Sequence, residues 1–513
     1  MRAAQGGRFR AAASGTVSAV AAVVVGELLA GLLSPSLSPL AAVGGALIDA
    51  LPPGVKEWAV SLFGTADKTV FVTGMLIVIA AVGGLAGILE QRRRFAGAAV
   101  MAVFGLVGLV AVITRAQVTF GAVPVPLAAA LAGALLLRFL IRRLQEDAST
   151  DAPVPTGTGR RTFLQVLAAS AAVTAVAGIL AGVWRGAAAG ISTAREKLKL
   201  PAADSAAPAI PAGAEVSLDG MQPLVTPNND FYRIDTALIV PVIDPDTWTL
   251  RVTGMVDQEI ELNLADLLAK PLIERHVTIA CVSNEVGGDL IGNARWLGWP
   301  VRELLSMARP QAGADMVLSR SSDGWTAGTP LEVLTDTRDA ILAVGMNGEP
   351  LPLEHGFPVR MIVPGLYGYV SATKWLTELR LTKFANDEGY WTPRGWSERG
   401  PIKTASRIDV PRQGKRVSAG TVQFGGVAWA QHTGIGKVEL RVNRGTWQQA
   451  DLAPGISRDT WYQWQLGITL SPGQYEVQVR ATDLNGEPQA EEPRPVAPDG
   501  ATGFHTIRVD VSP

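Results

Sequence analysis

The only cysteine of this 513-residue chain, Cys281, directly follows a segment, His276 to Ala280, that is typical of a buried β-strand. One cysteine cannot form an internal disulfide, so packing, reactivity and metal ligation are the roles open to it. A Gly-Gly-Asp turn follows at residues 287–289. A thiolate at the end of a strand, beside a loop, is a soft ligand suited to a transition metal. Free cysteines are also often buried like other small hydrophobic residues. The segments around Cys281 therefore have to distinguish packing from metal ligation.

Three further segments of the second half carry useful side chains, at residues 226–233, 319–330 and 353–375. In the last of them His355, Arg360 and Lys374 are separated by Gly and Pro turns, and they can converge on a phosphate. Loop amides near Ser371 to Thr373 can add donors. The chain has no Gly-x-Gly-x-x-Gly or Walker pattern and no His/Cys cluster with zinc spacing. Nicotinamide, flavin, nucleotide and structural zinc sites are therefore not indicated.

In their order and spacing, these segments and the Cys281 segment resemble the sulfite oxidase family of molybdenum enzymes, over about residues 216–510. The resemblance implies a molybdenum held by the dithiolene of molybdopterin, with Cys281 as the one protein ligand of the metal. Trp325 and Arg295 are candidates for the wall of the catalytic pocket. The cofactor contacts that the resemblance implies are Asn229, Tyr232, Arg233, Cys281, Ser322, His355, Arg360, Ser371, Ala372, Thr373 and Lys374.

The departures from the family concern the substrate. Sulfite oxidases carry an arginine shortly after the cysteine, where this chain has Glu285 and Val286, and a tyrosine near the metal, where the nearest residue here is Trp325. A sulfite dianion needs clustered cations, so sulfite itself is disfavoured. We predict two-electron oxygen-atom transfer on a small substrate, in either direction. The alternatives are sulfite-dehydrogenase-like oxidation of a sulfur compound and a cofactor-less membrane interaction protein.

The elements that must position this chemistry begin with a membrane domain at residues 1–185. Five apolar stretches reach the length of about 20 residues that a spanning helix needs, and they predict a five-helix transmembrane bundle: Ala11–Leu33, Thr69–Leu89, Phe95–Ile113, Val125–Ile141 and Phe163–Trp184. Arginines concentrate before the first stretch and in alternate loops, which places these loops in the cytoplasm and the rest of the chain outside the cytoplasmic membrane. Arg160 and Arg161 before the fifth stretch resemble a twin-arginine signal. Glu27 is the one carboxylate well inside a span, and no span contains a histidine for haem.

Behind the membrane domain, residues 186–215 are predicted to be a flexible linker, with Ala and Pro concentrated in Pro201–Ala214. Residues 216–398 follow as an α+β molybdopterin domain of the sulfite oxidase type. Residues 399–513 show period-2 strands and Gly/Pro turns, which predict an all-β immunoglobulin-like sandwich and, through the resemblance, a homodimer. The net charge of −1 excludes nucleic acid as a partner on electrostatic grounds. The expected partners are the lipid bilayer, a small-molecule substrate and a separate cytochrome or quinone-linked electron partner.

Overall fold

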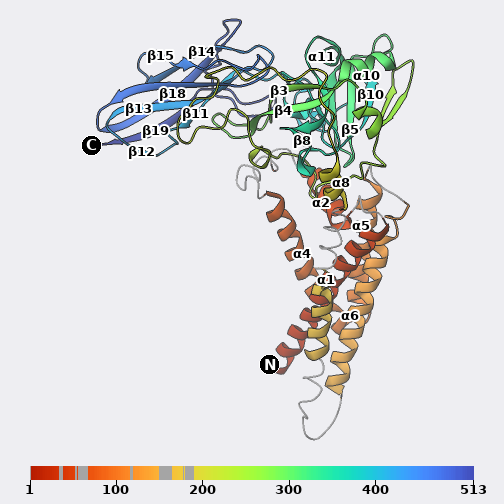
Figure 1. The fold of residues 1–513 in the computed structure, drawn as a ribbon. Helices are drawn as coiled ribbons and strands as arrows, with labels where there is room; N and C mark the ends of the chain where they lie inside the picture. The colour runs from red at the N-terminus through yellow and green to blue at the C-terminus, as the bar shows by residue number, and fades with distance from the viewer. Residues whose placement is uncertain are drawn as a thin grey trace. The chain divides into compact units, whose positions relative to one another are not determined.

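The structure is a computed structural model, and it describes residues 2–33, 38–51, 55, 67–115, 120–149, 164–176, 178 and 190–513 (Figure 1). The chain divides into two compact units. The helical unit comprises Met1–Ser192 together with the short segment Thr236–Val242, and the second unit comprises Thr193–Asp235 and Ile243–Pro513. The predicted membrane domain is thus separate from the chemistry-bearing half, except that one short segment from that half packs with the helices.

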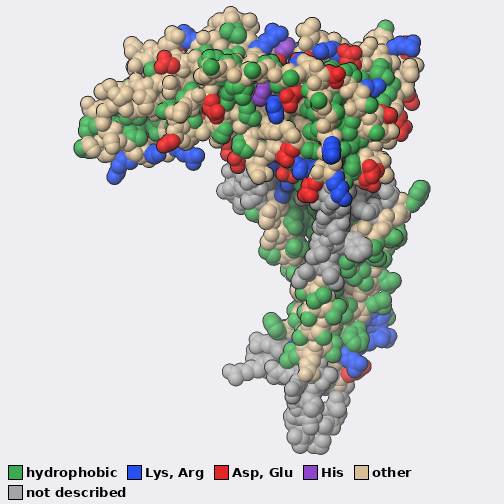
Figure 2. Space-filling view, in the orientation of Figure 1, with side chains coloured by type: hydrophobic (Ala, Val, Ile, Leu, Met, Phe, Trp, Pro, Cys, Tyr) green, Lys and Arg blue, Asp and Glu red, His purple; other side chains and the backbone are tan. Residues whose placement is uncertain are grey.

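Among the described residues of the first unit, four helices are long and apolar enough to cross a membrane, over Gly7–Leu33, Lys68–Arg92, Ala96–Ile113 and Val125–Glu146. They belong to α1 (Arg2–Leu33), α4 (Asp67–Arg92), α5 (Ala96–Ile113) and α6 (Val125–Ser149). Large apolar side chains such as Ile77, Val110 and Leu131 are more than half exposed on them, and Figure 2 shows the hydrophobic colour spread over these helices. Such surfaces suit a lipid environment, so the first four predicted spans are confirmed as apolar helices.

The fifth predicted span is described only in part. Residues Leu164–Val176 form a shorter apolar helix, and most of the remainder to Trp184 lies outside the described residues. Arg160 and Arg161, the twin-arginine prediction, lie outside them too. The short α2 helix (Pro39–Asp49) occupies the stretch between the first two spans. The five-helix count therefore stays a prediction.

Close backbone contact joins α1 to α4. A Cβ atom added to Gly15 would lie 2.0 Å from the Gly83 carbonyl, and one added to Gly87 would lie 2.0 Å from the Ala11 carbonyl. Small residues that admit this approach are the usual means of helix packing in membranes. Two buried carboxylates accept hydrogen bonds from the first backbone amides of a following helix. Glu27 accepts from Leu40 at the start of α2, and Glu90 accepts from Gly97 and Ala98 at the start of α5. Glu27 thus has a structural role as a helix cap.

Two sheets build the region that carries the predicted chemistry. The first has the order β2-β1-β10-β5-β6 and the second runs β3-β4-β7-β8, with β9 also on β7. Short helices α9 (Leu264–Leu268), α10 (Val301–Ala308) and α11 (Leu331–Thr335) interrupt the strands, in agreement with the α+β prediction. The strands are β1 (Thr249–Gly254), β2 (Ile260–Asn263), β3 (Ile273–Ala280), β4 (Ile291–Pro300), β5 (Met316–Ser321), β6 (Thr326–Pro330), β7 (Ile341–Met346), β8 (Glu349–Pro350), β9 (Arg360–Ile362) and β10 (Leu376–Thr382).

The predicted linker is not free in solution where the structure describes it. After helix α8 (Gly190–Lys197), the Asp204 amide donates to the Leu272 carbonyl and the Glu274 amide donates to the Ser205 carbonyl, both at 2.8 Å. Arg195 donates to the carbonyls of Pro350 and Leu351. The Ala/Pro-rich composition predicted a tether, but backbone hydrogen bonds along the edge of β3 hold this stretch against the sheet.

The C-terminal strand region, residues 405–512, is all-β and contains two sheets of order β11-β13-β17-β16 and β12-β19-β18-β14-β15. Side chains from both sheets, including Phe424, Trp464 and Val479, share one buried core. This agrees with the all-β prediction, while the immunoglobulin-like assignment stays a prediction. The strands are β11 (Ala405–Val410), β12 (Arg416–Ser418), β13 (Gly420–Trp429), β14 (Ile435–Val442), β15 (Gln448–Gln449), β16 (Asp451–Leu452), β17 (Tyr462–Leu470), β18 (Gly473–Asp483) and β19 (His505–Ser512).

Candidate cofactor and metal site

Cys281 lies at the end of β3, as its position after a strand-like segment predicted. The β3–β4 pairing ends at Ala280 opposite Ile291, so the chain leaves the sheet at the cysteine. Burial raises the pKa of the Cys281 thiol, whereas hydrogen bonds from Ser283 and the positive charge of Lys374 lower it. The thiol is thus placed at a sheet edge within electrostatic reach of a lysine that lies more than 90 residues further along the chain.

A shared carboxylate organises two of the predicted cations. The Asp235 Oδ2 atom lies 3.0 Å from Lys374 Nζ and 3.0 Å from Arg233 Nε. Lys374 also donates to the Glu354 carbonyl at 2.9 Å. Asp235 is 7% exposed and Lys374 is 10% exposed at their side chains, so this ion pair is largely removed from water. Asp235 was missed by the sequence analysis, although its place two residues after Arg233 was a signal.

Arg360 and His355 form the second part of the site. The Arg360 Nη1 atom donates to the His355 carbonyl at 3.1 Å, and its guanidinium lies over the Trp296 ring at 5.1 Å. Burial lowers the pKa of Arg360 to about 10. Burial and the charges of Lys374 and Arg360 lower the pKa of His355 to about 3, so its ring is neutral. Because His355 Nε2 lies 3.0 Å from the Asn228 carbonyl, Nε2 carries the proton and Nδ1 is an acceptor.

Three buried polar atoms of this cluster lack a hydrogen-bond partner within the part of the chain that the structure describes: His355 Nδ1, Arg360 Nε and Ser322 Oγ. Buried polar atoms in folded proteins nearly always have partners. All three belong to residues that the sequence predicted as cofactor contacts. One is an acceptor, one is a donor and the hydroxyl can be either, so the set matches a group that carries both N–H donors and anionic oxygens.

The loop from Ser371 to Trp375 closes the site and is held from several sides. Ser371 Oγ donates to the Tyr367 carbonyl at 2.9 Å, and the hydroxyls of Thr373 and Ser319 lie 2.6 Å apart. The hydroxyl groups of Ser371 and Thr373 thus hydrogen-bond within the protein. Their role in binding a ligand is to hold the backbone of the loop in place. Gly356, at φ +110°, leaves room for this loop, because a Cβ atom there would lie 3.1 Å from the Lys374 Cα atom.

The loop between β5 and β6 adjoins the cluster through Trp375. The Ser322 amide donates to the Trp375 carbonyl at 2.8 Å, which places Ser322 beside the residue that follows Lys374. Trp325 is half-buried in the same loop, where its amide donates to Asp323 Oδ1 at 3.0 Å. Burial and the charge of Asp235 raise the pKa of Asp323, whereas Lys374 lowers it. Asp323 is a second acidic neighbour of the site that the sequence analysis did not single out.

Tyr232 belongs to the cluster, whereas Arg295 does not. The charges of Cys281 and Arg360 both act on the Tyr232 phenol, whose pKa is raised mainly by burial. Asn229 is exposed, and its neighbour Asn228 is the residue whose carbonyl contacts His355. Arg295 pairs with His276 in the sheet, which is five residues before Cys281, and it lies 3.2 Å from Glu274. The structure therefore gives Arg295 an ion-pair partner away from the thiol.

Lys374 makes anion binding at this site dependent on pH. Burial lowers the pKa of Lys374 to about 8, against the opposing charge of Asp235, so its positive charge is present below that pH and lost above it. We expect bound cofactor to dissociate several-fold faster at about pH 9.5 than at about pH 7. Molybdenum retained after gel filtration at each pH measures this. A Lys374→Arg variant keeps its charge over this range and should show a flat profile; an equally steep profile in the variant would assign the effect to another group.

Sequence comparisons give the family of the chain. Residues 237–391 match the family described as the oxidoreductase molybdopterin binding domain. Mitochondrial sulfite oxidase of Homo sapiens is 31% identical over 351 residues, which cover 56% of this chain and 62% of that protein. The uncharacterized oxidoreductase YuiH of Bacillus subtilis (strain 168) is 37% identical over 158 residues, or 31% of this chain and 76% of YuiH. The chain belongs to the sulfite oxidase family of molybdopterin-dependent oxidoreductases.

Membership of the sulfite oxidase family implies the molybdenum–molybdopterin cofactor, and a structural comparison agrees with the family fold. The sulfane dehydrogenase SoxCD from Paracoccus pantotrophus has a TM-score of 0.50 and 21% identity, over 57% of this chain and 82% of that one. At this identity the likeness concerns the fold alone. The chain covers 62% of the human sulfite oxidase that it matches. This match therefore does not assign the substrate of that enzyme to this chain.

The residues present fit this cofactor. Molybdopterin carries a pterin with N–H donors and a terminal phosphate, which suit the acceptor His355 Nδ1 and the cations Arg360, Lys374 and Arg233. Among the described residues no group of three or more His, Cys, Asp or Glu side chains is arranged to hold a metal. Cys281 would supply the thiolate of the protein to a metal that the pterin dithiolene also binds.

Proposed function

We propose that the protein is a membrane-anchored molybdenum oxidoreductase that transfers one oxygen atom and two electrons to or from a small substrate. The observation that carries the proposal is the set of unpartnered buried atoms on His355, Arg360 and Ser322. They lie in one cluster with two further cations and with Cys281 at the end of β3. A bound cofactor would give these atoms partners, and an unmet buried polar atom otherwise destabilises the fold.

The residues of the chain bind and orient, and the cofactor supplies the redox chemistry. When bound, the cofactor would supply the two-electron redox chemistry of oxygen-atom transfer. Arg360, Lys374 and Arg233 would hold the anionic groups of the cofactor, and the neutral His355 ring would offer Nδ1 as an acceptor to one of its N–H donors rather than join the cations on a phosphate. Cys281 supplies a thiolate to the metal, and the neighbouring lysine favours the deprotonated thiol that ligation needs.

The helical unit supports a membrane anchor. The exposed apolar side chains of α1, α4, α5 and α6 are the supporting observation. Arg92, Arg93 and Arg94 separate the second and third spans, and Arg142 and Arg143 follow the fourth. The positive-inside rule then places these loops in the cytoplasm and, with a fifth span, the catalytic half outside the cytoplasmic membrane.

The remaining elements of the proposal are the substrate class and the partners. Glu285 and Val286 are exposed at the positions after Cys281 where a sulfite site has its arginine, so a neutral S- or N-oxide suits the pocket better than a dianion. Reduction of an oxide consumes two electrons and two protons and releases water. A cytochrome or quinone-linked partner would supply the electrons. Homodimer formation through the C-terminal strand region is part of the same proposal.

The decisive experiment is the metal content of the purified full-length chain. Protein from a host that makes molybdopterin is expected to contain about one molybdenum per chain and to give a Mo(V) electron paramagnetic resonance signal on partial reduction. Protein from a host that cannot make molybdopterin is the matched control and should contain none. Molybdenum-free protein from the competent host would contradict the proposal and favour a membrane interaction protein.

A further inference from the structure

The loop that carries Cys281 is closed by its own hydrogen bonds. The Cys281 amide donates to the Leu290 carbonyl at 2.9 Å, and the Leu290 amide donates to Asn284 Oδ1 at 2.9 Å. Within the loop, the Gly288 amide donates to the Glu285 carbonyl at 2.9 Å. Because both ends and the turn are tied together, a displacement at the Gly287–Gly288 turn changes the position of the thiol.

A buried ion pair of the C-terminal strand region holds this turn. Arg407, on β11, donates from Nη1 to the Gly288 carbonyl at 2.7 Å. Its Nε atom lies 2.6 Å from Asp409 Oδ1, and both side chains are 6% exposed. An apolar contact could join the two regions without the desolvation penalty of a buried ion pair. The guanidinium also fixes an orientation, because its planar set of donors holds the Gly288 carbonyl in one position relative to the Asp409 carboxylate.

The ring of His505, at the start of β19, packs against the same turn at Gly287. Gly287 has φ +80°, and a Cβ atom there would lie 2.2 Å from His505 Cδ2. His505 Nδ1 accepts the Ile408 amide at 3.0 Å, which fixes the ring plane and leaves the proton on Nε2. Burial and the charge of Arg407 lower the pKa of His505 to about 4, so the ring stays neutral near neutral pH.

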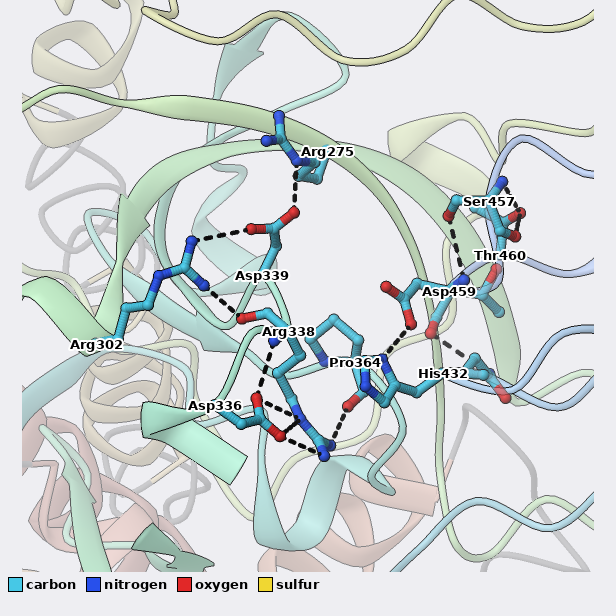
Figure 3. A network of polar contacts seen from close by, with 12 residues as sticks. Arg275, Arg302, Asp336, Arg338, Asp339, Pro364, His432, Ser457, Asp459 and Thr460 are labelled. Carbon is cyan, nitrogen blue, oxygen red and sulfur yellow. Dashed lines mark hydrogen bonds and ion pairs between the residues drawn. The ribbon is translucent and has the colours of Figure 1, made fainter. Parts of the chain in front are cut away.

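The strand that leads to Cys281 is held by a second contact from the same region. The Thr278 amide donates to the Asp459 carbonyl at 2.9 Å, and the Trp461 amide donates to Thr278 Oγ1 at 2.8 Å. Figure 3 shows that Asp459 lies in a turn with Ser457 and Thr460, where its carboxylate meets His432. The cysteine is thus bracketed, with one contact three residues before it and another six to seven residues after it.

We propose that Arg407 and His505 are positioning residues that hold the Cys281 loop in the geometry required for metal ligation. The inference rests on the proposed function in one respect, that the thiol is the metal ligand. It assigns to the C-terminal strand region a part in the metal site besides any part in dimer formation. Arg407 meets the loop at the Gly288 carbonyl and His505 meets it at Gly287, so both act through the loop backbone.

The test uses the single cysteine of the chain as its reporter. Full-length protein is produced without cofactor, and the rate at which the disulfide reagent DTNB modifies Cys281 is measured. We expect Arg407→Lys and His505→Ala to react at least ~10-fold faster than wild type, because thiol reactivity follows access and local opening. Arg441→Lys is the matched control. Arg441 lies on β14 of the same region and stacks on Trp447, and its variant should react within about twofold of wild type.

Two further measurements separate a positioning role from a general loss of folding. His505→Ala removes no buried charge, so it carries the test if Arg407→Lys does not fold. In cofactor-loaded protein, His505→Ala is expected to shift the g values of the Mo(V) signal at unchanged molybdenum content, which a purely structural role would not do. Equal DTNB rates in wild type and His505→Ala, or the same acceleration in Arg441→Lys, would overturn the inference. The DTNB rates need no molybdenum, so a failure of the proposed function would be seen separately, in the metal analysis.

Discussion

Cys281→Ser is expected to lower turnover by about 100-fold or more, since replacing groups that merely support a metal ligand already has effects of 10–100-fold. A serine hydroxyl has a much higher pKa than a thiol and is a harder donor, so it changes the electronics of the metal. The cofactor should remain bound, because Arg360, Lys374 and His355 are untouched. The measurements are molybdenum content, the Mo(V) signal and viologen-driven reduction of dimethyl sulfoxide as a probe oxide.

The matched comparison for this variant is Ser283→Ala. Ser283 lowers the pKa of the thiol by hydrogen bonding but leaves the sulfur in place, so its loss should have a much smaller effect on the Mo(V) signal. Full turnover by Cys281→Ser, with an unaltered signal, would remove the thiol from the metal site. Loss of molybdenum together with turnover would mean that Cys281 is needed for cofactor insertion as well.

Asp235→Asn is expected to destabilise the cofactor-free protein by about 3 kcal/mol, because removing one partner of a buried ion pair leaves the other charge uncompensated. Here a single carboxylate oxygen serves both Lys374 and Arg233. Bound cofactor brings its own negative charge to these cations, so the loaded variant should lose less stability. Thermal unfolding of both forms, followed by tryptophan fluorescence, measures the difference.

Asp339→Asn is the control for this variant. Asp339 also lies between two arginines, Arg275 at 2.6 Å and Arg302 at 3.4 Å (Figure 3), but it is 27% exposed. Partly exposed pairs contribute less than about 1 kcal/mol, so its variant should unfold almost like wild type. A Lys374→Met change in the Asp235→Asn background should restore part of the lost stability. Equal losses in Asp235→Asn and Asp339→Asn would show that burial of the pair has no special consequence.

Local patterns predicted much of this protein. The segment before Cys281 identified a strand, and the Gly/Pro turns around His355 and Arg360 identified a loop-built cation cluster. Long apolar stretches located four helices because spanning length and composition are properties of the segment itself. Each of these features depends on neighbours in the sequence, so a single chain was enough to see it.

The features that were missed depend on contacts distant in sequence. Asp235 and Lys374 meet across 139 residues, and no local rule pairs them. Arg295 follows the cysteine segment closely in sequence, yet antiparallel pairing carries it back toward His276 and away from the thiol. The linker had a tether-like composition, but the edge of β3 offered it backbone partners. In each case contacts between residues distant in sequence determined the position of the group, and these contacts cannot be read from local sequence patterns.

The segment Thr236–Val242 has a consequence for attempts to detach the catalytic half. Lys68 donates to the Ala237 carbonyl at 2.8 Å, and a Cβ atom on Gly44 would lie 2.5 Å from Leu238 Cδ1, so this segment packs with the helices. A single proteolytic cut before Thr193 would therefore not release a water-soluble fragment. The fragment would stay attached to the helices through the apolar side chains of Thr236–Val242. A secreted form would need polar replacements at Ala237 and Leu238.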